Sequence, residues 1–225
     1  MAEVRRRRLL ATLRARFDGA ALQVALPGQP ANAVRKPSAT QLAQWAPLQA
    51  WSFEGAGTGS SPLLRPTQAP QVELPFSAAV WPADDPTALD LIDAFSRHLD
   101  GSHQLLAAGG ALAELRLRLR VKARDVMWWR RRQASDPWDC GYALDAPETR
   151  AALARFEPRR ATLMVAVGWP EDAMVDALMA MQKTAPQFTH PVRWLVVQNG
   201  PETLTGLLST LGVPVKALQL RAADA

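Results

Sequence analysis

Three stretches of the chain repeat one pattern, and this pattern constrains the fold more than any other feature. Each has a short apolar run, then a turn with proline and one or two acids, then an amphipathic helix: SAAVWPADDPTALDLIDAF, LMVAVGWPEDAMVDALMAM and WLVVQNGPETLTGLLSTL. Proline and acids in the first turn are typical of helix starts. Apolar runs that alternate with helices indicate parallel strands joined by crossover helices. The sequence therefore predicts an α/β fold with a mostly parallel sheet.

The same criteria divide the chain into two parts, 1–75 and 76–225. Within the second part we expect strands and helices in this order: strand 141–144, helix 147–156, strand 161–167, helix 171–183, strand 192–198, helix 202–211 and strand 213–219. The first part is predicted to hold a basic amphipathic helix at 3–17. After it comes an irregular segment rich in Pro, Gly and Ser, with one short helix near 39–46.

The stretch ELRLRLRVKARDVMWWRRR, residues 114–132, fits two secondary structures. Apolar and basic residues alternate as in a strand, but leucine, arginine, glutamate and alanine favour a helix, and we predict a helix. On that helix Arg116, Arg120 and Arg124 line one flank, four residues apart, and Arg130, Arg131 and Arg132 follow. These arginines are either an anion-binding or partner-binding surface, or a solvated flank paired with nearby acids.

The overall charge leaves several classes of partner open. A net charge of +5 and an isoelectric point near 10.1 suit nucleic acid, anionic lipid or an acidic protein. The one cysteine, Cys140, excludes an internal disulfide framework and fits a reducing compartment. We see no secretory signal and no apolar run of about 20 residues, and so expect a cytoplasmic protein.

The sequence contains no complete motif for catalysis or cofactor binding. GQPANAVRKPS, residues 28–38, lacks the second glycine of a phosphate loop and has Pro37 after its lysine. The predicted helix starts carry acids and prolines, which disfavour phosphate. The histidines have no metal spacing, and GxSxG is absent. We therefore predict no enzyme activity and no cofactor. A magnesium-dependent hydrolase remains an alternative, with ligands drawn from the acidic turns, Asp84, Asp85, Glu171 and Asp172.

The N-terminal helix combines four consecutive arginines, Arg5, Arg6, Arg7 and Arg8, with an apolar stripe of Leu9, Leu10, Leu13 and Phe17. Successive side chains on a helix step by about 100°, so part of this charge must border the stripe. A basic helix with a narrow apolar stripe is typical of segments that lie on anionic membranes. The alternative is that the stripe packs on the α/β domain and the arginines are solvated.

The segments RRATLMVAVGWPEDAMVDALMAMQ and VRWLVVQNGPETLTGLLSTLG resemble a family of uncharacterised bacterial inner-membrane proteins whose genes lie beside a GTPase gene. In that family membrane spans precede a basic segment and a soluble α/β region, and Arg5–Arg8 would match the basic segment. The resemblance implies a non-catalytic interaction domain at the inner face of the inner membrane, with a protein partner such as the GTPase. The main alternative is a nucleic-acid-binding protein that uses the arginine-rich helix.

Overall fold

The computed structural model describes residues 39–55, 74–83, 88–101 and 137–218. In this part of the chain five strands form one sheet in the order β2-β3-β4-β1-β5, and every neighbouring pair is parallel. The strands are β1 (Phe76–Pro82), β2 (Asp139–Ala143), β3 (Thr162–Val167), β4 (Val192–Gln198) and β5 (Val215–Ala217). The predicted α/β class with a parallel sheet is confirmed.

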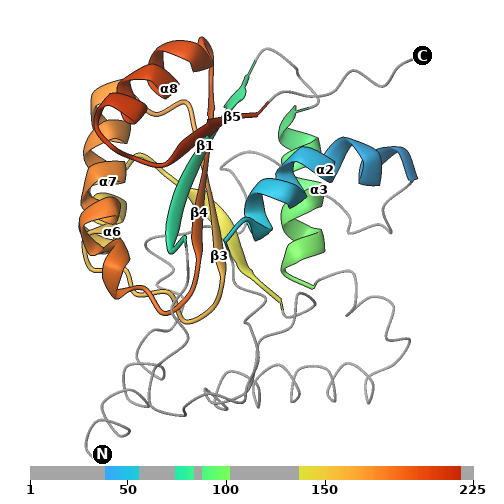
Figure 1. The fold of residues 1–225 in the computed structure, drawn as a ribbon, viewed down its shortest axis with the longest axis horizontal. Helices are drawn as coiled ribbons and strands as arrows, with labels where there is room; N and C mark the ends of the chain where they lie inside the picture. The colour runs from blue at the N-terminus through green and yellow to red at the C-terminus, as the bar shows by residue number, and fades with distance from the viewer. Residues whose placement is uncertain (1–38, 56–73, 84–87, 102–136, 219–225) are drawn as a thin grey trace, which may run out of the picture.

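Helices cover both faces of this sheet (Figure 1). On one face lie α6 (Pro147–Leu153), α7 (Glu171–Thr184) and α8 (Pro201–Thr210), and on the other lie α2 (Ala39–Phe53) and α3 (Ala88–Leu99). In the strand order, the chain first moves from β1 past β4 and β3 to β2. From β2 it moves back in the opposite direction through β3 and β4 to β5. Because such crossovers are right-handed, the reversal of direction places α3 opposite the other three helices.

Strands β1, β2, β3 and β4 each supply both apolar layers by alternation of their side chains. In β1, Ala78 and Val80 join the layer under α6, α7 and α8, whereas Ala79 and Trp81 join the layer under α2 and α3. All four side chains are fully buried. Burial on both faces explains why β1, β3 and β4 are mostly apolar rather than strictly alternating with polar residues.

The predicted elements of the second part lie within a few residues of those observed. The largest difference is β5, a three-residue strand where the sequence predicted 213–219. In the first part, α2 extends to Phe53 instead of ending near residue 46, although Pro47 lies inside it. Its Trp45, Leu48 and Trp51 are buried. The ring of Trp45 packs against that of Phe95 on α3, with the two ring centroids 5.9 Å apart. Packing against α3 thus extends this helix beyond what its sequence alone indicated.

Two further predictions lie outside the described residues. These are the N-terminal helix at 3–17 and the helix at 114–132.

Candidate functional site

The carboxyl ends of the strands are the usual ligand site of a parallel sheet, especially where neighbouring connections leave toward opposite faces. Here that point lies between β1 and β4, because β1 leads to α3 on one face and β4 leads to α8 on the other. A nucleotide or metal would be expected to bind at this edge. Among the described residues, the turns that follow β3 and β4 lie at this edge.

The helix starts at this edge are unsuited to phosphate. Pro170 precedes α7 and Pro201 opens α8, and neither has a backbone N–H to donate. Exposed carboxylates follow at once, Glu171 and Asp172 on α7 and Glu202 on α8. These acids stabilise the helices through the macrodipole and would repel a phosphate at the same position.

Trp169 lies in the turn between β3 and α7 and is buried. Gly168, which precedes it, has a φ of +64°, so the chain turns sharply at the end of β3. The buried indole N–H donates to the carbonyl oxygen of Ala143 at the end of β2, over 2.9 Å. Its ring also meets that of Trp194 edge to face, with centroids 6.1 Å apart. Trp169 therefore links the turn after β3 to the end of β2 by a hydrogen bond and packs on β4 through Trp194.

The acidic turns do not form a metal site in the described ranges, where no group of three potential ligands is placed to hold an ion. Asp84 and Asp85, half of the set considered for magnesium, lie outside those ranges. Glu171 and Asp172 are both exposed at the start of α7.

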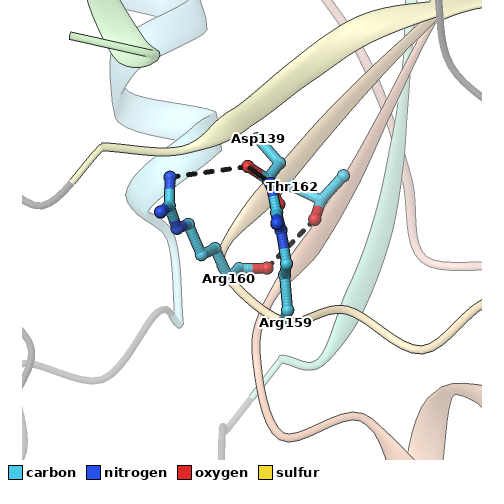
Figure 2. A network of polar contacts seen from close by, with 4 residues as sticks. All are labelled: Asp139, Arg159, Arg160 and Thr162. Atoms are coloured by element: carbon cyan, nitrogen blue, oxygen red, sulfur yellow. Dashed lines mark hydrogen bonds and ion pairs between the residues drawn. The ribbon is translucent and has the colours of Figure 1, made fainter. Parts of the chain in front are cut away.

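A second polar cluster lies at the opposite edge of the sheet, where β2 and β3 begin (Figure 2). The Asp139 carboxylate accepts two hydrogen bonds from Arg159, at 2.7 and 3.2 Å, and lies 3.6 Å from Arg160. The Thr162 hydroxyl donates to the backbone carbonyl of Arg160 at 3.0 Å. Bidentate pairing in a half-buried position fixes the entry of the chain into both strands.

Arg193 is a buried cation on the side of β4 that faces α2, and its exposed fraction is 0%. Its guanidinium donates to the carbonyls of Ser52 at 3.1 Å, Leu74 at 3.0 Å and Val192 at 3.2 Å, and also to that of Glu54. Burial lowers the pKa of Arg193 to about 10, partly offset by the Glu54 carboxylate. The side chain thus caps the end of α2 and ties it to the sheet.

The polar groups between α3 and β2 also have ordinary structural explanations. Burial of the Cys140 thiol, with the Asp100 and Asp139 carboxylates nearby, raises its pKa well above the usual value. Burial likewise raises the pKa of Tyr142, and the Asp93 carboxylate adds to this shift. A thiol held protonated is a poor nucleophile.

The anion-binding residues predicted from the sequence all lie outside the described residues: Arg5, Arg6, Arg7, Arg8, Arg116, Arg120, Arg124, Arg130, Arg131 and Arg132. Their roles therefore stay predictions.

Sequence reasoning missed one surface, on the outer side of α7 and α8. Met179 is 38% exposed, and Leu207 and Leu211 are each 39% exposed. In the sequence these residues look like core positions of amphipathic helices. Only the packing of the two helices on the sheet shows that they face outward.

The fold and its edges define the class of the protein as an α/β domain with a five-stranded, all-parallel sheet. Comparison with protein-family models, with curated proteins and with solved structures gave no match. None of the helices in the described ranges combines the length and the apolar character needed to cross a bilayer.

Proposed function

We propose that this protein is a non-catalytic interaction domain of a bacterial membrane-associated system. In this role it docks a protein partner, and it contacts anionic lipid through Arg5–Arg8. The observation that carries the proposal is the carboxyl edge of the sheet. There, prolines, exposed acids and a packed tryptophan occupy the positions at which related folds bind nucleotides.

Charge and the supply of backbone N–H donors both disfavour phosphate at these helix starts. A bound phosphate needs free backbone N–H groups at the positive end of a helix. At α7 and α8 the carboxylates of Glu171, Asp172 and Glu202 already occupy that region, and proline removes a donor from each start. Recognition by an extended surface is therefore favoured over recognition in a pocket.

The lipid part is tested by co-sedimentation with vesicles that contain phosphatidylserine, at low salt. Each arginine near an anionic surface contributes about 1 kcal/mol. Replacement of Arg5–Arg8 by glutamine should therefore abolish binding and leave the circular dichroism spectrum unchanged. A control with two charge changes replaces Arg150 of α6 and Arg155 shortly after it, both exposed, by glutamine, which should have little effect. Wild-type protein that ignores these vesicles would contradict the lipid part.

The non-catalytic part is tested by isothermal titration with ATP, GTP and Mg²⁺, for which we expect no micromolar binding. The protein-partner part is tested by looking for a GTPase gene beside this one and titrating the protein with the GTPase it encodes. Absence of a GTPase gene from that locus would remove the support that the resemblance provides. Steeply salt-dependent binding to short DNA would instead favour the nucleic-acid alternative.

A further inference from the structure

The two halves of α2, on either side of Pro47, are held to the rest of the chain in different ways. Three side chains of the second half are at most 1% exposed: Leu48, Trp51 and Ser52. In the first half, Trp45 is the only buried side chain among the described residues 40–46. Leu42, in the same half, is 45% exposed. Burial therefore holds the second half more firmly than the first.

The second half, with the residues just after it, is also tied to the sheet by polar bonds. The Arg193 guanidinium on β4 donates to the carbonyls of Ser52 at 3.1 Å and of Glu54. The Glu54 carboxylate in turn pairs with Lys216 on β5 at 3.2 Å. Figure 1 shows the C-terminal end of α2 beside the sheet, whereas the N-terminal end extends past α3 and away from the sheet. The second half therefore acts as an anchor.

Trp45 connects the first half to α3. Its ring packs against those of Phe95 and His98, with centroids 5.9 and 5.3 Å away. Its indole N–H is buried but has no hydrogen-bond partner among the described residues. A buried donor without an acceptor costs free energy, which is recovered when the donor meets water. The contact of Trp45 with α3 is therefore stabilised by apolar packing and weakened by the unpaired indole N–H.

Pro47 weakens the link between the two halves, because it lies in the interior of the helix. It has no N–H to donate to the Ala43 carbonyl, four residues earlier, and its ring crowds that carbonyl. Sharp bends in helices concentrate at such prolines. The helix is therefore expected to bend most easily at Pro47.

We propose that α2 is a two-part strap, in which residues 48–53 are a fixed anchor and residues 39–46 swing off α3 about Pro47. In the closed form Trp45 packs on the rings of Phe95 and His98. In the open form Trp45 leaves these rings, and water hydrates its indole N–H. The strap is independent of the partner and lipid binding proposed above.

Residue-resolved hydrogen exchange of the full-length protein tests the strap. In an α-helix each N–H bonds to the carbonyl four residues earlier, so amides 43–46 report on the first half alone and amides 51–53 on the second. In the wild type, amides 43–46 should exchange faster than amides 51–53 by about tenfold or more, because opening of the first half leaves the anchor in place.

Two variants should move this difference in opposite directions. Pro47→Ala supplies the missing N–H and removes the ring, so it should slow the exchange of amides 43–46 by about tenfold or more. Trp45→Ala removes the contact with α3 and should accelerate the same amides, with a much smaller change at 51–53. The matched control is Gln49→Ala, which places alanine at an exposed position of the same helix and should change amides 43–46 by less than about threefold.

The outcomes that would overturn the strap are distinct. Slow and equal exchange in both halves of the wild type would show that the first half does not open separately. Fast and equal exchange would show that α2 leaves the sheet as one unit. Unchanged exchange of amides 43–46 in Pro47→Ala would show that Pro47 is not the hinge. This last result is decisive even if Trp45→Ala fails to fold, since removal of an interior proline favours the helix.

Discussion

Replacement of Arg193 by methionine should separate α2 from the sheet. Methionine keeps much of the volume but removes every donor. The carbonyls of Ser52, Glu54, Leu74 and Val192 then lose the guanidinium. Arg193 donates both to Glu54, before the segment 56–73, and to Leu74, after it, so this one side chain joins the two ends of the segment. The backbone N–H of Leu74 also donates to the Gly55 carbonyl at 3.3 Å.

Two opposing terms set the size of the effect. A buried carbonyl without a donor costs about 1.5 kcal/mol, which applies to Ser52 and Val192, and the part-buried carbonyls of Leu74 and Glu54 cost about 1 kcal/mol each, so the four together cost roughly 5 kcal/mol. Against this, methionine removes the cost of burying a charge. The fall of the Arg193 pKa to about 10 gives the scale of that cost. At 1.36 kcal/mol per pKa unit it amounts to roughly 3 kcal/mol. We therefore expect Arg193→Met to lower the free energy of unfolding by about 1–3 kcal/mol.

Urea denaturation followed by tryptophan fluorescence measures this change, and hydrogen exchange locates it. Amides of α2 should exchange faster in Arg193→Met, while those of α7 should change in proportion to global stability only. The control Arg155→Met alters an exposed arginine whose one hydrogen bond is 3.4 Å long, and it should cost less than about 0.5 kcal/mol. Equal or higher stability of Arg193→Met would refute the account, because desolvation of the charge would then outweigh the carbonyl bonds.

Three further measurements test other parts of the structure. Tyr142 is the only tyrosine, and its raised pKa means that absorbance at 295 nm should show no tyrosinate near pH 10 until the chain unfolds. Above pH 10 the folded state still holds a proton that the unfolded state has lost, so the free energy of unfolding should fall as pH rises beyond about 10. Tyrosinate formation near pH 10 in the folded protein would contradict this. Asp139→Asn weakens a half-buried carboxylate cluster with two arginines and should cost about 1–2 kcal/mol in urea denaturation. Asp145→Asn, in the exposed pair with Arg150, should cost less than about 0.5 kcal/mol, and equal effects of the two variants would refute the distinction.

The sequence predicted the C-terminal part well because local signals there agree with one another. Proline and acids open α7 and α8, and mostly apolar runs correspond to β3 and β4. Agreement was poorer where packing decides the outcome. The end of α2 depends on Arg193, which lies 140 residues away in the sequence and is buried among carbonyls. A charged residue inside an apolar run gives no local sign that it caps a distant helix.

The amino-acid sequence by itself determined the parallel α/β class, because hydrophobic periodicity and helix-start chemistry act over a few neighbouring residues. Only the tertiary structure decided the strand order, which places β1 between β4 and β5 and α3 on the face opposite α7 and α8. It also decided that Met179, Leu207 and Leu211 face outward, whereas their neighbours on the same helices are buried. These features depend on contacts between segments far apart in the chain. Exposure of a side chain follows from the surface on which its helix packs, and that surface is formed by the whole sheet.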